Sequence, residues 1–456
     1  MTNLIVELSK YLMIFFFALY TYECFAVFRK KNDVTRQDRI FKRQIGLMYL
    51  IHLDAFLVIY AVTDENKVIG FYVLQVLLLA AIQVSYQLFY ENASRLVVNN
   101  MCMLLVVGFI MLTRLSWEKA VKQYAIALGA AALTMIIPFL VKKIKFLRKL
   151  TWCYAAVGII ALLLVLVAGT TSYGAKISIS FGGFSIQPSE FIKILFVFFV
   201  AGMLYQNTDF KQVCLATVVA AVHVLILVAS RDLGGALIFF VTYLVMLYVA
   251  TKKIFYFTGG ILCGSIAAVV AYKMFAHVRV RVVAWQDPLS VIDKEGYQIS
   301  QSLFAIGTGG WFGMGLYQGM PNKIPVVEQD FIFSAISEEM GGIFALCLLM
   351  VCVSCFLMFL NVAMQMKDQF YKLVALGLGT IYGFQVFLTV GGVTKFIPST
   401  GVTLPLVSYG GSSLLATMVM FAIVQGLYIL RQNEGENNGR EKRKKTGFDT
   451  EIEEFR

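Results

Sequence analysis

The residues best suited to chemistry are the acids of residues 276–340, a polar stretch between two long apolar runs. This stretch holds seven carboxylates: Asp287, Asp293, Glu295, Glu328, Asp330, Glu338 and Glu339. A carboxylate within hydrogen-bonding distance of a hydroxyl group can accept its proton while a new bond forms. The stretch therefore predicts general acid–base catalysis, and the alternative for each acid is a solvated surface charge.

No other class of catalytic site is indicated by the sequence. The three histidines stand at unrelated positions, and there is no metal-ligand spacing, P-loop or nucleophile elbow. The eight cysteines lie inside apolar runs, so no disulfide framework is expected.

A second candidate group opens an apolar run with the sequence Gln187-Pro188-Ser189-Glu190. Lys193 follows Glu190 by three residues, so the two side chains share one face of a helix. Ionisable residues inside membrane segments are costly and commonly functional. The pair predicts either a cation that faces a substrate cavity or a structural ion pair.

Long apolar helices must position these residues. Hydrophobic residues make up 59% of the 456-residue chain and charged residues 14%, whereas soluble domains have about 45–50% and about 25%. The composition and the length of the apolar runs predict an all-α polytopic membrane protein. Thirteen runs are candidate spans: 4–28, 45–63, 68–90, 96–113, 124–141, 152–170, 190–206, 212–230, 234–251, 255–275, 341–362, 373–393 and 412–430.

The positive residues fix the expected orientation. Loops on one side of the thirteen runs carry 24 Lys and Arg, and the opposite side carries 12. The positive-inside rule places the C-terminal tail in the cytoplasm, and the N-terminus and residues 276–340 outside. The net charge of +12 is explained by this bias and by contact with membrane lipids, so no nucleic-acid partner is expected.

Five segments, taken in order, resemble the motifs of the SEDS family of bacterial membrane glycosyltransferases, the group of FtsW, RodA and SpoVE. The segments are Gly174–Lys193, Asp232–Ala236, Gly296–Gly319, Asp330–Gly341 and Gly401–Leu414. The resemblance implies a SEDS core of ten helices within residues 96–430. Residues 1–95 are then expected to be an added module of about three transmembrane helices, and residues 431–456 a polar cytoplasmic tail.

The resemblance also implies the function. Family members polymerise peptidoglycan glycan strands from lipid II, with undecaprenyl pyrophosphate as the leaving group, in cell division, elongation or sporulation. They work in the bacterial cell membrane with a class B penicillin-binding protein, a transpeptidase that cross-links the strands. We expect the same enzymatic activity, location and partners for this chain.

The family places its catalytic acid upstream of a Gly-Tyr-Gln motif, which is Gly296-Tyr297-Gln298 here. Val291 stands at the usual position of that acid. Asp293 is therefore the expected catalytic base, and Asp287 is the alternative.

Other polar residues of the matching segments are expected to bind the substrate. Cations would hold the pyrophosphate, with a divalent ion such as Mg²⁺ bridging its oxygens, while amides and hydroxyls would bind the sugars or the peptide. The expected substrate-binding residues are Lys176, Gln187, Glu190, Lys193, Gln298, Gln301, Asp330, Glu338, Glu339 and Ser408.

Two other functions compete with the polymerase. A flippase for a lipid-linked cell-wall precursor could use the same cations, but no internal repeat typical of many transporters is evident. A structural scaffold of the division or elongation machinery would not need the acids and amides of the outer stretch.

Overall fold

The computed structural model describes residues 2–29, 33–143, 146–172, 175–181 and 184–454. Each of the thirteen apolar runs is largely helical, and run 124–141 is divided between two helices, which confirms the all-α polytopic membrane fold. Within the described residues, twelve helical segments are long and apolar enough to cross a membrane, and the segment of the remaining run, α8 (Pro188–Leu204), has 17 residues. The others are α1 (Thr2–Arg29), α2 (Val34–Thr63), α3 (Asn66–Phe89), α4 (Arg95–Leu115), α5 (Trp117–Thr134) with α6 (Ile137–Lys143), α7 (Thr151–Ala168), α9 (Phe210–Ala229), α10 (Leu233–Thr251), α11 (Ile254–Met274), α14 (Ile332–Gln365), α15 (Gln369–Val393) and α16 (Gly411–Glu454).

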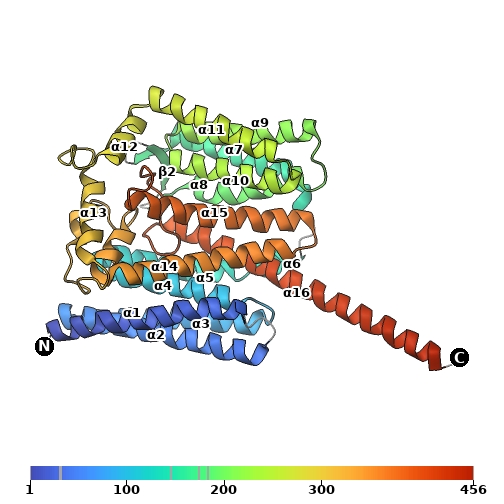
Figure 1. Cartoon of the computed structure of the whole chain (residues 1–456), viewed down its shortest axis with the longest axis horizontal. Helices are drawn as coiled ribbons and strands as arrows, with labels where there is room; N and C mark the ends of the chain where they lie inside the picture. The colour runs from blue at the N-terminus through green and yellow to red at the C-terminus, as the bar shows by residue number, and fades with distance from the viewer. Residues whose placement is uncertain (1, 30–32, 144–145, 173–174, 182–183, 455–456) are drawn as a thin grey trace.

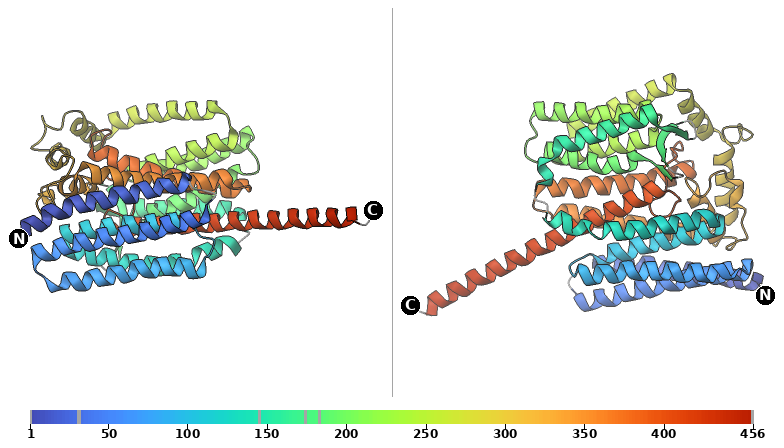
Figure 2. Two further views of the ribbon diagram at one scale, coloured as in Figure 1. Left: turned by 60° about the horizontal axis from the view of Figure 1, so that its bottom comes forward. Right: turned by 180° about the vertical axis from the view of Figure 1, so that it is seen from behind.

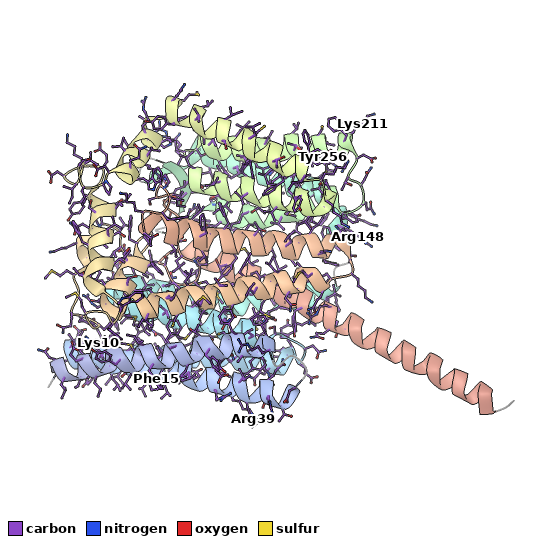
Figure 3. All side chains as sticks on the ribbon, in the orientation of Figure 1. Lys10, Phe15, Arg39, Arg148, Lys211 and Tyr256 are labelled. Atoms are coloured by element: carbon purple, nitrogen blue, oxygen red, sulfur yellow. The ribbon has the colours of Figure 1, made fainter. Side chains whose placement is uncertain are left out.

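The two ends of the chain lie at opposite ends of the bundle (Figure 1). The N-terminus lies at the end that carries α12 (Ala276–Gln286) and α13 (Tyr297–Gly309), and α16 projects from the other end as one continuous helix. Arg148 and Lys211 lie at the end from which α16 projects, whereas Lys10 lies at the opposite end (Figure 3). This arrangement agrees with an odd number of crossings and with the orientation expected from the positive residues.

Helices α1–α3 pack against the rest of the bundle as an integral layer. They lie alongside α4 and α14 in two different views (Figures 1 and 2). Tyr20 Oη donates to Asn100 Oδ1 at 3.0 Å, and Asn100 Nδ2 donates to Ser354 Oγ at 3.1 Å, so hydrogen bonds join α1 to α4 and α4 to α14. Because α1–α3 cover it, the apolar stretch of α4 is wholly buried and becomes the centre of the bundle.

We call the end of the bundle that carries α12 and α13 the outer end, because the positive residues predict that it faces outward, and the opposite end the cytoplasmic end. The outer end contains regular secondary structure in place of a simple loop. A small antiparallel sheet in the order β1-β2-β3 occupies part of the polar segment before α8: β1 (Thr170–Ser172), β2 (Ala175–Phe181) and β3 (Phe184–Ile186). Helices α12 and α13 and a 3₁₀ turn, η2 (Pro321–Lys323), divide residues 276–331. Helix α14 begins at Ile332, nine residues before the predicted run, and its helical geometry breaks at Gly341 (φ 90°).

The glycine-rich segment after α13 fits into this break in α14. Met314 N donates to Glu338 O at 2.9 Å and Gly315 N donates to Glu339 O at 2.8 Å, so the segment satisfies carbonyls that the break leaves free. Gly313 has φ +76°, and a Cβ there would lie 2.4 Å from Glu339 O. Lys10 Nζ also donates to Gly313 O at 3.5 Å, so α1 contacts this segment.

Replacing Gly313 by alanine is expected to destabilise the protein by about 1–3 kcal/mol, because the side chain meets both a positive φ and a backbone oxygen. Thermal unfolding of the detergent-purified protein measures the change. Gly307→Ala is the matched control, since a Cβ there has nothing within 4 Å and helix α13 gains a better helix former. Equal unfolding temperatures for the two variants would contradict this account.

Candidate functional site

Three helices begin close together at the outer end of the bundle. Ser189 Oγ, in the first turn of α8, donates to Asp232 Oδ2 at 3.2 Å, just before α10. Gln187 N donates to Ser412 Oγ at 2.9 Å, in the first turn of α16. The N-terminus of a helix carries partial positive charge and free N–H groups, so this convergence favours an anion.

Lys193 is the cation nearest to this convergence along α8. The residue is 2% exposed, and Nζ donates to Glu190 Oε2 at 2.6 Å and to Gln385 Oε1 at 2.8 Å. Gln385 Nε2 in turn donates to Thr403 O at 3.0 Å. The predicted Glu190–Lys193 pair therefore exists, and two of the three N–H groups of the ammonium are used within the protein.

Asp232 is the N-cap residue of α10. Its Oδ1 accepts from Gly235 N at 2.9 Å, which is the hydrogen bond of an N-cap. Burial raises the pKa of Asp232, and the nearby Glu190 adds to the effect, whereas the hydrogen bonds from Gly235 and Ser189 oppose it. An acid held in this way is better suited to positioning α10 than to carrying a proton.

Arg281 and Asp330 extend the group toward the outer surface. Arg281 on α12 is half-buried, donates from Nη1 to Ser399 O at 3.3 Å, and its charge acts on both Asp330 and Asp232. Burial raises the pKa of Asp330 to about 6, Glu328 adds to the rise and Arg281 opposes it. We name the set of Glu190, Lys193, Asp232, Arg281, Asp330 and Gln385 the outer polar cluster.

Gly401 leaves space beside the two charged groups. A Cβ at this position would lie 3.4 Å from Asp330 Oδ2 and 3.9 Å from Arg281 Nη2, and its φ is +72°. The glycine therefore keeps the carboxylate and the guanidinium accessible from one side.

Asp293, the expected base, lies in the turns between α12 and α13 with its side chain exposed. Among the described residues, no hydrogen bond or ion pair reaches its carboxylate. Asp287, the alternative, is also exposed, and its Oδ1 accepts from Ser290 N at 3.3 Å. The fold thus places both acids on the outer surface and a different acid, Asp330, inside the outer polar cluster.

The remaining outer candidates differ in their surroundings. Lys176 on β2 is exposed and donates to Leu166 O at 3.3 Å. Gln298 is exposed and donates to Pro325 O at 3.4 Å, while Gln301 is half-buried. Ser408 is buried and fully engaged, since its hydroxyl donates to Gln329 O at 2.5 Å and accepts from Leu404 N at 2.9 Å. Ser408 thereby ties the loop before α16 to the loop before α14.

Glu338 and Glu339 form a separate group near the break in α14. Arg114 pairs with Glu339 Oε1 through Nη2 at 2.9 Å and stacks on Tyr317 at 4.3 Å from its ring centroid. Glu338 Oε1 accepts from Met320 N at 2.9 Å. Because α14 begins at Ile332, these acids lie beyond its first turn and bind the outer loop instead of capping the helix.

Sequence reasoning missed the roles of Arg281 and Arg114. Each appeared only in the count of outer cations, because the partners of Arg281 lie about 50 and 120 residues away along the chain. The available signal was an arginine next to an apolar run on the side of the membrane that is poor in positive charge.

A family model described as "Cell cycle protein", for FtsW, RodA and SpoVE, matches residues 94–433. The peptidoglycan glycosyltransferase RodA of Mycobacterium tuberculosis is 38% identical over 315 residues, covering 65% of this chain and 67% of that protein. The stage V sporulation protein E of Bacillus subtilis is 34% identical over 311 residues, covering 64% of this chain and 82% of that protein.

Two solved structures share the fold. A chain from a peptidoglycan synthase complex superposes with a TM-score of 0.64 at 24% identity, covering 74% of this chain and 98% of that chain. RodA of Thermus thermophilus gives a TM-score of 0.54 at 23% identity, covering 74% and 96%. Residues 1–93, which include α1–α3, precede the segment that the family model matches.

Proposed function

This chain belongs to the FtsW, RodA and SpoVE family of cell cycle proteins, and on that premise we propose that it is a bacterial peptidoglycan glycosyltransferase. It joins the disaccharide units of lipid II into glycan strands and releases undecaprenyl pyrophosphate. Relatives named as peptidoglycan glycosyltransferases support the reaction class. The observation that carries the proposal is a buried lysine and a half-buried arginine among converging helix N-termini at the outer end of a membrane bundle.

The leaving group explains the positive charge in the outer polar cluster. Pyrophosphate departs readily only when its negative charge is compensated, and preorganised donors in a site shielded from water are effective at this. Lys193 retains one N–H for such a ligand, and Arg281 retains donors beyond its bond to Ser399. The isoprenoid tail of the substrate would lie among the apolar helices. This requirement explains why the enzyme is embedded in the membrane.

The acceptor hydroxyl requires a base. Asp330 suits this role because a pKa of about 6 lies near neutral pH, where a general base is both ionised and basic. Asp293 is still the base that the sequence favours, with Asp287 as its alternative. Both acids lie in exposed turns, so either could act as the base only if its turn moved toward the bound substrate. Direct attack of the hydroxyl on the anomeric carbon breaks the bond to pyrophosphate and inverts the configuration.

A divalent ion such as Mg²⁺ stays part of the proposal as an ion that would bind together with the substrate. Among the described residues, no group of three or more His, Cys, Asp or Glu side chains is arranged to hold a metal, but Mg²⁺ needs only one or two carboxylates when substrate phosphates supply further ligands. The protein groups assigned to the charge of the pyrophosphate are Lys193, Arg281 and the helix N-termini.

The proposal includes a class B penicillin-binding protein as the partner transpeptidase. One structural neighbour comes from a complex described as coordinating polymerisation and crosslinking. Cross-linking needs a second active site close to the growing strand, which a membrane-bound polymerase does not supply alone. One relative is named for sporulation and the family model is described as a cell cycle protein, so the proposal covers cell division, elongation and sporulation.

Reconstitution with lipid II tests the proposal. The protein in liposomes, alone and with its co-purified transpeptidase, is expected to produce glycan strands that a muramidase digests. Fluorescent lipid II tests the flippase alternative in the same liposomes. Translocation without polymer, with or without the partner, would replace the polymerase by the flippase.

A further inference from the structure

A polar cavity lies at the cytoplasmic end of the bundle, where the added helix α3 meets helix α4 of the family core. Its walls come from the last two turns of α3, the turn of residues 90–94 and the first turns of α4. Its volume is about 140 Å³, which is enough for several water molecules. It lies at the opposite end of the membrane from the outer polar cluster, so the proposed polymerase reaction does not use it.

The wall of this cavity contains a buried donor without a partner. Gln83 is 5% exposed, and its Oε1 accepts from Tyr49 Oη at 3.3 Å. Its Nε2 has no hydrogen-bond partner within the part of the chain that the structure describes. A buried N–H group left unpaired costs about 1–3 kcal/mol. Because Nε2 itself is covered by its neighbours, the amide of Gln83 must turn toward the cavity to meet an occupant that supplies an acceptor.

Arg95, at the start of α4, lines the cavity with a positive charge. Arg95 pairs through Nη1 with Asp38 Oδ1 at 2.5 Å, and a guanidinium has five N–H groups. Asn99 donates through Nδ2 to Gln44 Oε1 at 3.0 Å, which leaves its oxygen as an acceptor, and Glu91 adds a carboxylate. These groups match a phosphate ester that carries a further hydroxyl or amine.

The neighbouring surface of α3 is apolar and faces outward. Val84, Leu88 and Phe89 are 51%, 71% and 72% exposed, as expected for side chains that face acyl chains. Polar pockets with basic side chains on the cytoplasmic side of helix bundles are suited to lipid headgroups. A free phosphate ester would make no use of this apolar flank.

We propose that this cavity binds the headgroup of a glycerophospholipid from the cytoplasmic leaflet. Arg95 and Gln83 Nε2 hold the phosphate, and Asn99 and Glu91 accept from the hydroxyl or amine beyond it. The lipid thereby joins the added helices α1–α3 to the family core, since Gln83 belongs to the former and Arg95 to the latter.

Native mass spectrometry of the detergent-purified full chain, titrated with phosphatidylglycerol, tests the site. Arg95→Met is expected to weaken binding of one lipid at least tenfold. Lys42→Met is the matched control, because Lys42 also pairs with Asp38, at 2.8 Å, but does not line the cavity. Gln83→Leu is the second variant and tests the same site without disturbing that ion pair, with an expected loss of about fivefold.

Several outcomes would overturn the proposal. Equal lipid binding by the wild type, Arg95→Met and Gln83→Leu would do so, as would an equal loss in Lys42→Met. Diacylglycerol, which lacks phosphate, should not compete with phosphatidylglycerol; if it competes equally, the phosphate is not recognised. If glycerol 3-phosphate competes as well as the lipid, the cavity takes a free phosphate ester instead of a membrane lipid.

Discussion

Replacing Lys193 by methionine is expected to reduce glycan-strand synthesis by about 10²–10³-fold, the usual effect of removing one preorganised donor from a developing charge. Lys193 is buried, and its ammonium is held in place by hydrogen bonds to Glu190 and Gln385, so its charge is preorganised. Initial rates of polymer formation from lipid II measure the effect. Lys211→Met, a lysine at the cytoplasmic end, is the control and should retain the wild-type rate.

A double variant separates binding of pyrophosphate from a purely structural ion pair. If Lys193 only balances the charge of Glu190, the double variant Glu190→Gln with Lys193→Met removes both charges and should recover much of the lost activity. If Lys193 compensates the leaving group, the double variant stays as slow as Lys193→Met. Recovery in the double variant would therefore refute the role assigned to this lysine.

Replacing Asp330 by asparagine is expected to lower the rate by about 10²–10⁴-fold, the contribution of a general base. The pKa of about 6 adds a signature in the pH profile. The base must be ionised, so the wild-type rate should fall about tenfold per pH unit below about pH 6. The residual activity of Asp330→Asn should lack this acid limb.

The unfolding temperature of Asp330→Asn shows whether the variant loses activity because the base is missing or because the protein is unfolded. Burial raises the pKa of Asp330 from 3.8 to about 6, so between these values the folded state binds more protons than the unfolded state. The ionised carboxylate therefore lowers the free energy of unfolding at neutral pH. This loss of stability becomes smaller as pH falls through about 6 and is gone below 3.8. The asparagine variant should unfold at a temperature no lower than the wild type at pH 7.

The same assay compares Asp330 with the acids that sequence reasoning favoured. Asp293→Asn and Asp287→Asn place the same change on exposed acids of the outer turns. Loss of the acid limb in Asp293→Asn, with normal polymerisation by Asp330→Asn, would return the catalytic role to Asp293. It would also require residues 287–296 to move toward the outer polar cluster when lipid II binds.

The order of apolar runs and motifs predicted more of the fold than of the site. The thirteen runs became helical because a segment of about 20 apolar residues in a membrane must satisfy its own backbone hydrogen bonds. The early start of α14 was missed because its first turns contain Ser, Glu and Gly. The strands β1–β3 were missed because they are short and lie in a polar segment.

The Glu190–Lys193 pair could be predicted because both residues lie on one turn of one helix, so spacing alone sets their distance. Spacing could not predict that Gln385 accepts a hydrogen bond from Lys193. It also could not predict that Arg281 lies close enough to Asp232 and Asp330 for their charges to interact. These residues lie on α15, α12, and the segments before α10 and α14, and only the packing of helices decides which ends meet. The sequence alone thus determined that the chain spans the membrane and the family to which it belongs, and it predicted which end faces outward, because hydrophobicity, local motifs and charge bias are properties of short segments. Which acid lies beside which cation depends on contacts between distant segments, and only the tertiary structure brings Asp330 near Arg281.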